Sequence, residues 1–383
     1  MMKTLKVFFL ATLLMGTGTG ESSIFDSFGK VSLADGSRIA FVASVTDPTI
    51  IAVDTAKNEV AATITIPHIS GPIVVSDRLK GLYVTDPENE QVTVIDLVSR
   101  EVVGVLDIGM RPDAALLNPF DRYIAFGSKD GQVSIWDMQF LRQVLHISNL
   151  ESAVNMTFGL DGRNLFVVEQ AKKHISVIEM QARKKVAQIN LGGPVDSGAE
   201  VSAISRSADG STGFVSVTSE NRVVVIDLVN WKVKASIRVG GGPVRPFSPA
   251  DNRYVLIPHR SGKSLTVLSA LSYEVIATVK TGVEAKGLNT GWLDTVAFIM
   301  PETGNRIGVV DLDDLELIKT IELPGQPDDG LVTSDSRKLF TAMLDSGAVA
   351  AIDTKTHTLT AVIETTEKHL RGIEIALSNN VCH

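Results

Sequence analysis

One short pattern recurs eight times along the chain: a run of β-branched and other apolar residues that ends in an acid or a serine. Four short strands with their turns occupy about 40–45 residues. The spacing of the pattern therefore predicts one four-stranded β-propeller blade per repeat, and an all-β fold. The copies end at Asp54, Asp96, Asp137, Glu179, Asp227, Ser269, Asp311 and Asp353, which are 42, 41, 42, 48, 42, 42 and 42 residues apart.

The ends of the repeat array predict how the ring closes. The first unit has three strand-like segments, 38–44, 50–53 and 60–66, but no innermost strand, whereas a spare strand at 372–377 follows the eighth repeat. Pairing the spare strand with the first unit closes the ring and removes its exposed sheet edges. We predict eight blades by this count, with seven left open if an end unit packs irregularly.

The first residues have the order of a secretory signal peptide. Lys3 and Lys6 precede the apolar run 7–15, and small residues follow at 16–20. This order of charge, apolar run and small residues predicts export to the periplasm or an equivalent extracytoplasmic compartment. The predicted boundaries are 1–20 for the signal peptide, 21–37 for a lead segment, 38–378 for a single propeller domain and 379–383 for a C-terminal tail.

Composition excludes several classes of function. The 383 residues include 36 Lys and Arg against 44 Asp and Glu, a formal net charge of −8. A nucleic-acid-binding surface needs clustered positive charge, so we expect no nucleic-acid partner. The single cysteine excludes an internal disulfide framework and a cysteine-rich metal site. After the leader, no stretch approaches the ~18 apolar residues of a membrane helix, so no membrane span is expected.

Two short motifs resemble known sites but are incomplete. Cys382-His383 ends the chain like a covalent haem motif, yet Asn379 occupies the place of the first cysteine in Cys-x-x-Cys-His. Residues 262–264 (Gly-Lys-Ser) resemble the end of a phosphate-binding loop, but a strand pattern follows instead of a helix. Without a helix N-terminus this segment predicts a hairpin turn.

The usual catalytic and metal motifs do not occur in the sequence. Asp311, Asp313 and Asp314 are close together but lack the glycine and terminal glutamate of a calcium loop. There is no His-Glu-x-x-His and no Gly-x-Ser-x-Gly, and the seven histidines are dispersed. We therefore expect no metal site, no catalytic residues and no cofactor held by this chain.

A propeller can still build a site at its central channel, from residues far apart in sequence. The segments that lead into the innermost strands form one mouth of that channel. We select His369, Arg371 and Arg245 as candidates to bind an anionic ligand or a haem carboxylate. The alternative is that these charges simply face water. The charged residues of these segments are Arg111, Asp113, Glu200, Arg245, Glu284, Lys286, Asp328, Asp329, His369 and Arg371.

One repeat is longer than the others. The step of 48 residues from Glu179 to Asp227 places its extra residues near 192–200, in a loop at the predicted mouth. Loops vary without disturbing the sheets and often contact ligands or partners. We therefore predict Asp196 and Glu200, together with the mouth residue Arg111, as partner contacts. For the extra residues, a tolerated surface insertion is the alternative.

One unit supports a family resemblance. Residues 83–86 (Tyr-Val-Thr-Asp) followed by 92–96 (Val-Thr-Val-Ile-Asp) resemble the YVTN-type β-propeller repeat, in which Tyr-Val-Thr-Asn precedes an apolar run ending in Asp. Asp86 stands where the family has Asn, and the other units keep the pattern loosely. The resemblance covers nearly the whole chain after the leader and implies the propeller fold. Relatives of this type include cell-surface proteins, the haem d1 domain of a nitrite reductase and large subunits of amine dehydrogenases.

Among multi-subunit redox enzymes, the chain is similar to the β subunits of hydrazine synthases, which are exported propellers beside haem-bearing subunits. The similarity implies a non-catalytic subunit of a complex that makes hydrazine from nitric oxide and ammonium. Haem would then be held by partner proteins. Fold alone does not decide function, so two alternatives stay open. They are a haem-d1-like or small-ligand-binding propeller with its site at the channel mouth, and a stand-alone extracellular binding propeller.

Overall fold

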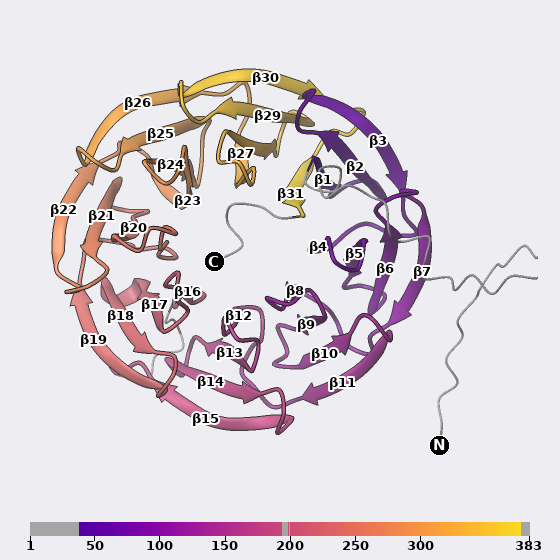
Figure 1. The fold of residues 1–383 in the computed structure, drawn as a ribbon, viewed down its shortest axis with the longest axis horizontal. Coiled ribbons are helices and arrows are strands. Elements are labelled where there is room, and N and C mark those ends of the chain that lie inside the picture. Colours follow the sequence, from indigo (N-terminus) through magenta and orange to yellow (C-terminus); the bar gives the residue numbers. More distant parts are fainter. Residues whose placement is uncertain (1–37, 194–197, 199, 377–383) are drawn as a thin grey trace, which may run out of the picture.

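The computed structural model of the protein describes residues 38–193, 198 and 200–376, which form an eight-bladed β-propeller (Figure 1). Within these residues the one helical element is the short 3-10 helix η2 (Thr218–Glu220). The all-β class and the count of eight blades are therefore confirmed. The predicted signal peptide, lead segment and tail, together with Asp196 and Cys382-His383, lie outside the described residues.

The strands of each blade follow one another outward from the axis of the ring. Blade 1 consists of β31 (Leu370–Ile375), β1 (Ile39–Ser44), β2 (Thr49–Asp54) and β3 (Glu59–Thr65), and blade 2 of β4 (Ile73–Ser76), β5 (Gly81–Asp86), β6 (Gln91–Asp96) and β7 (Val102–Asp107). Blade 3 consists of β8 (Ala114–Leu117), β9 (Tyr123–Gly127), β10 (Val133–Asp137) and β11 (Arg142–Ile147), and blade 4 of β12 (Met156–Phe158), β13 (Asn164–Glu169), β14 (His174–Glu179) and β15 (Lys184–Asn190). Blade 5 consists of β16 (Ser205–Arg206), β17 (Thr212–Val217), β18 (Arg222–Asp227) and β19 (Lys232–Arg238), and blade 6 of β20 (Tyr254–Pro258), β21 (Ser264–Ser269) and β22 (Val275–Lys280). Blade 7 consists of β23 (Ala285–Gly291), β24 (Val296–Pro301), β25 (Arg306–Asp311) and β26 (Glu316–Glu322), and blade 8 of β27 (Pro327–Val332), β28 (Lys338–Met343), β29 (Ala348–Asp353) and β30 (Thr358–Glu364).

The acid that closes most repeats caps the turn between the third and fourth strands. In blade 2, Asp96 Oδ1 accepts the backbone N–H groups of Val98 (2.9 Å) and Ser99 (2.7 Å). Asp and Ser side chains favour such turns because they hydrogen-bond the backbone a few residues on. The fourth residue after each closing position has a positive φ. These residues are Asn58, Arg100, Leu141, Arg183, Trp231, Tyr273, Leu315 and His357.

The antiparallel pairing of the strands places the turns and loops on two opposite faces of the propeller. In blade 2, Gly81 at the start of β5 pairs with Asp96 at the end of β6, so the first–second and third–fourth strand turns share one face. Asp86 pairs with Gln91 at the other end. We call this second face, which also carries the loops into the innermost strands, the mouth face. The other is the opposite face.

The core lies between neighbouring blades. Between blades 8 and 1, Phe340 and Val349 pack in one cluster with Val42, Ile51 and Ile373, all of them buried. Because neighbours cover both faces of a sheet, its inner strands need apolar residues on both sides. This explains why the repeats are continuous apolar runs instead of alternating patterns.

The last described strand closes the ring as predicted. In Figure 1, yellow β31 lies beside indigo β1, and Val42 pairs with Ile373 in antiparallel register. The N-terminal and C-terminal parts of the chain therefore share blade 1. No helix among the described residues is long and apolar enough to cross a bilayer.

Blade 6 departs from the predicted four strands. Its sheet has three, and its inner segment makes two isolated bridges, Pro243 with His259 and Phe247 with Leu256. Pro243 and Pro246 lack the N–H that a strand ladder needs, which explains the interruption. Residues 262 and 263 lie in the connection between β20 and β21, as the turn prediction required.

Candidate functional site

A cavity of about 630 Å3 lies at the axis of the ring and is lined by residues from all eight blades. Ligand sites in proteins commonly have volumes of about 300–1,000 Å3, so the cavity is large enough for a small molecule or cofactor. Its lining comes mainly from the innermost strands. The sequence predicted a channel site of this kind, and the structure supplies its composition.

The wall of the cavity is divided by polarity. Blades 2 to 4 contribute mainly apolar residues, among them Val74, Leu116 and Phe158. Blades 5 to 8 and blade 1 contribute most of the charged side chains. These are Arg206, Arg245, Lys286, Asp329 and Glu374. Further acids, Asp77 and Asp121, line the cavity toward the opposite face.

Arg245 reaches the cavity because the inner segment of blade 6 is irregular. It sits between Pro243 and Pro246, and its Nη2 donates to the carbonyl of Ile204 at 3.2 Å. Burial lowers the pKa of Arg245, Asp329 opposes this shift, and neighbouring Arg206 adds to it. An arginine remains charged nonetheless. Arg206, on β16, is only 5% exposed, whereas Arg245 is exposed to the cavity. The two guanidinium groups influence one another and belong to the same wall.

Lys286 and Asp328 form an ion pair beside these arginines. The Lys286 ammonium is paired with the Asp328 carboxylate and lies 3.7 Å from Asp329 Oδ1. Asp328 Oδ2 also accepts the backbone N–H of Gly372 at 2.9 Å. Burial would lower the pKa of Lys286, but Asp329 and Asp328 raise it above its ordinary value. Lys286 is therefore held as a cation.

Two other carboxyl groups at the cavity, those of Glu374 and Asp329, have raised pKa values. Burial raises the pKa of Glu374 to about 7, with a smaller contribution from the charge of Asp329. Burial also raises the pKa of Asp329, although Lys286 opposes the shift. Both side chains are accessible from the cavity, yet the blades enclose them. The surrounding protein therefore disfavours their charged forms and raises their pKa values, although both side chains face the cavity.

The predicted ligand-binding residues are only partly brought together. Arg245 lines the cavity, while Arg371 lies outside the lining but close enough to influence Lys286. His369 is exposed, and its Nδ1 lies 3.0 Å from the carbonyl oxygen of Leu344. It is not among the lining residues.

The predicted partner contacts have local partners. Arg111 pairs with Glu88 and Asp113, both at 2.9 Å. Glu200 pairs with Arg260 at 3.2 Å. These ion pairs lie on the mouth face, and the role of these residues in docking stays a prediction.

Arg206 and Glu374 were not among the residues predicted from the sequence. The predicted residues came from the segments that lead into the innermost strands, and Arg206 and Glu374 lie further along, near the ends of β16 and β31. For Glu374 a signal existed, because the acid interrupts the apolar residues Ile373 and Ile375 of an innermost strand. A charge there points to the axis of the ring.

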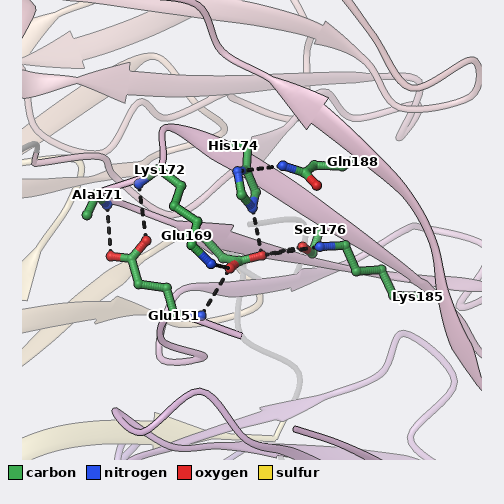
Figure 2. Close-up of polar contacts among 8 residues, drawn as sticks. All are labelled: Glu151, Glu169, Ala171, Lys172, His174, Ser176, Lys185 and Gln188. Atoms are coloured by element: carbon green, nitrogen blue, oxygen red, sulfur yellow. Dashed lines mark hydrogen bonds and ion pairs between the residues drawn. The ribbon is translucent and has the colours of Figure 1, made fainter. Parts of the chain in front are cut away.

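A second polar cluster surrounds Glu169 in blade 4 (Figure 2). The Glu169 carboxylate lies 2.9 Å from His174 Nε2 and accepts a hydrogen bond from the Ser176 hydroxyl. It also accepts hydrogen bonds from Lys172 Nζ (3.1 Å) and from the backbone N–H of Glu151 (3.0 Å). Ser176 therefore bonds the acid directly and is fully buried. A nucleophilic triad requires the histidine to activate the serine, so we assign this cluster a structural role.

No group of three or more His, Cys, Asp or Glu side chains with metal-binding geometry occurs among the described residues. Asp311 Oδ1 instead accepts the backbone N–H groups of Asp313 and Asp314, at 2.8 and 2.9 Å. Asp313 also pairs with Arg253. These three acids form a turn.

The chain has sequence similarity to one named protein. It is 26% identical over 127 residues to NirF of Stutzerimonas stutzeri, a match that covers 33% of this chain and 32% of NirF. The matched stretch thus spans about a third of that relative. No protein-family model matches the chain, so the finer assignment to the YVTN repeat stays a prediction.

Solved structures share the fold. The dihydro-heme d1 dehydrogenase NirN in complex with DHE superposes with a TM-score of 0.73 at 16% identity, covering 91% of this chain and 76% of NirN. Hydrazine synthase of Kuenenia stuttgartiensis gives 0.54 at 17% identity, covering 77% of this chain and 95% of the matched chain. The protein is thus an eight-bladed propeller with NirF-like sequence over part of its length, and with NirN and a hydrazine synthase chain among its structural neighbours.

Proposed function

We propose that the protein binds an anionic tetrapyrrole of the haem d1 class in its central cavity. The observation that carries this proposal is the division of the cavity wall. Arg206, Arg245 and Lys286 lie toward one side, and apolar residues of blades 2 to 4 lie toward the other. A tetrapyrrole is a flat, largely apolar ring with carboxylate substituents, so it complements both sides.

The residues present fit the periphery of such a ligand better than a histidine-bound iron. Among the described lining residues the soft donors are the methionines Met156 and Met300, and neither histidine nor cysteine is included. Arginine is suited to carboxylates because its planar guanidinium donates two parallel hydrogen bonds. We therefore assign recognition to carboxylate–arginine pairs. The likeness to NirN, a dihydro-heme d1 dehydrogenase solved in complex with DHE, supports this class of ligand.

A titration with deuteroporphyrin, a metal-free porphyrin with two propionates, tests the proposal by absorbance and fluorescence. We expect saturable binding that Arg206→Ala and Arg245→Ala each weaken roughly tenfold to hundredfold, because each removes a charge-assisted hydrogen bond. The dimethyl ester of the same porphyrin should bind weakly. Arg163→Ala, whose side chain is 81% exposed, is the matched control. Equal binding by all four proteins would reject the site.

A second candidate is the role implied by hydrazine synthase: a non-catalytic subunit of an exported redox complex whose partners hold haem. One observation favours docking. Large apolar side chains are exposed in turns of the opposite face on blades 2 to 7, whereas the mouth face contributes Val45 and Ile69. The exposed residues of the opposite face are Val98, Phe120, Phe140, Leu141, Leu160, Val229, Leu271 and Leu293. Exposed apolar side chains gathered on one face are typical of interaction surfaces.

Native mass measurement on protein from its source organism tests the second candidate. We expect a complex with a haem protein in an extracytoplasmic fraction, and weaker association after Leu271→Ser with Leu293→Ser. Val45→Ser serves as the control on the mouth face. A cofactor-free monomer would instead support a stand-alone binding propeller.

A further inference from the structure

The cavity holds acids as well as the arginines proposed to bind an anion. Glu374 on β31 and Asp329 on β27 line the same space as Arg206 and Arg245. β27 and β31 are in contact as neighbouring innermost strands. Arg245 acts electrostatically on Asp329, and Asp329 acts on Glu374. An anionic ligand paired with Arg245 therefore brings its negative charge close to Asp329, and this carboxyl is coupled to that of Glu374.

Asp328 shows how a compensated acid is held in this wall. It pairs with Lys286 and accepts the Gly372 N–H. The Glu374 carboxylate has no ion pair or hydrogen bond with a described residue, and the charge that acts on it is that of Asp329. Like charges in a poorly solvated space cannot all stay ionised, so an added anion favours protonation of one carboxyl.

We infer that the cavity takes up a proton when an anionic ligand binds, and that Glu374 holds that proton. The inference rests on the proposed function and specifies how the same site is regulated. It is supported by the shared cavity wall of Glu374 and Asp329 and by the pKa of about 7 that enclosure by the blades gives Glu374. A nearby anion raises this value further, so the carboxyl goes from partly to fully protonated near neutral pH.

The groups around Glu374 set the direction of the effect. β27 contributes Asp328 and Asp329, β23 contributes Lys286, and Arg371 lies on the same strand as Glu374. The neighbouring strands β1 and β4 contain no titratable residue. β28 contains Lys338, whose ammonium bonds the carbonyl of Thr55 and the side chain of Asn58. Because Asp329 shares the raised pKa, the two carboxyls titrate as a pair, and the variants must separate them.

Calorimetry of deuteroporphyrin binding, in two buffers of different ionisation enthalpy, measures the proton uptake directly. The propionates of the probe stay ionised between pH 6 and 9, since carboxyl pKa values lie near 4. We expect uptake approaching one proton per ligand at pH 8. Affinity should fall up to about tenfold for each pH unit above 7, the limit for a single linked proton.

Glu374→Gln should abolish the uptake and make affinity independent of pH from 6 to 9, with the affinity at pH 8 higher than that of the parent protein. Glu284→Gln makes the same chemical change at a mouth-face residue paired with Lys263, and should leave the uptake unchanged. Thermal unfolding of each variant checks that the ring is intact, and Glu374→Asp, which keeps a titratable carboxyl, should restore the uptake.

The outcomes separate this inference from the function on which it rests. Absence of binding by every protein at every pH would reject the proposed function. Binding without proton uptake would leave that function in place and overturn the inference. Loss of uptake in Asp329→Asn, with uptake retained in Glu374→Gln, would overturn the assignment to Glu374.

Discussion

At the scale of single residues, the protein contains two glutamates with opposite properties. Glu169 is 1% exposed, whereas Glu374 faces the cavity. Burial alone would raise the pKa of Glu169, but the hydrogen bonds from Ser176 and His174, with others, lower it to about 2. Glu374 has burial without such bonds, and its pKa rises to about 7. The first arrangement stabilises a fold, whereas the second leaves a group able to exchange a proton at neutral pH.

The contrast yields a stability prediction for Glu169→Gln. The folded pKa of about 2 lies below the ordinary 4.5, so ionised Glu169 stabilises the protein fully above pH 4.5, and this contribution disappears as pH falls through 2. We expect the variant to lose roughly 3 kcal/mol at pH 7, and progressively less in acid. Urea unfolding at several pH values measures this loss. Exposed Glu101→Gln is the control, and a loss that does not depend on pH would contradict the ionic explanation.

At the scale of elements, the turns could be predicted from sequence, whereas the residues of the site could be predicted only in part. The closing acids identify their turns because an Asx cap depends on neighbours a few residues away, as at Asp96. Arg206 and Glu374 become a site only when blades 5 and 1 meet at the axis. The acid between Ile373 and Ile375 indicates that Glu374 faces the axis, but local sequence does not indicate that Arg206 shares its cavity. In blade 6, Arg245 was a candidate from the sequence and does line the cavity, but the interruption of its strand beside Pro243 and Pro246 was not predicted.

A glycine in the innermost strand of blade 1 offers a test at this scale. Gly372 has φ +62° beside a register shift in the β1–β31 pairing, and an added Cβ would meet no atom within 4 Å. Gly372→Ala should therefore cost about 1–2 kcal/mol of folding free energy through backbone strain alone. Gly109→Ala, at φ +70° and equally open, should cost the same. A much larger loss at Gly372 would show that its bond to Asp328 depends on this conformation.

At the scale of the whole molecule, closure by β31 makes a distant segment part of blade 1. Eight blades form one ring only if the last joins the first, because an open ring would expose two sheet edges and the apolar faces beside them. The channel depends on the same closure, since β31 contributes Glu374 to its wall. Stability and ligand binding should therefore fail together when β31 is loosened.

Ile373→Ala tests how far stability depends on β31. Ile373 is 6% exposed and packs in the cluster that joins blades 8 and 1, so its truncation should cost about 2–5 kcal/mol. Ile276→Ala, at a residue 49% exposed on the outer strand of blade 6, should change stability by no more than about 0.5 kcal/mol. Hydrogen exchange should show faster opening in β1, the partner of β31, than in blade 4, across the ring. If the loss of protection from exchange were instead spread evenly over all eight blades, the ring would unfold as one cooperative unit. β31 would then stabilise the whole molecule and not only the contact between blades 8 and 1.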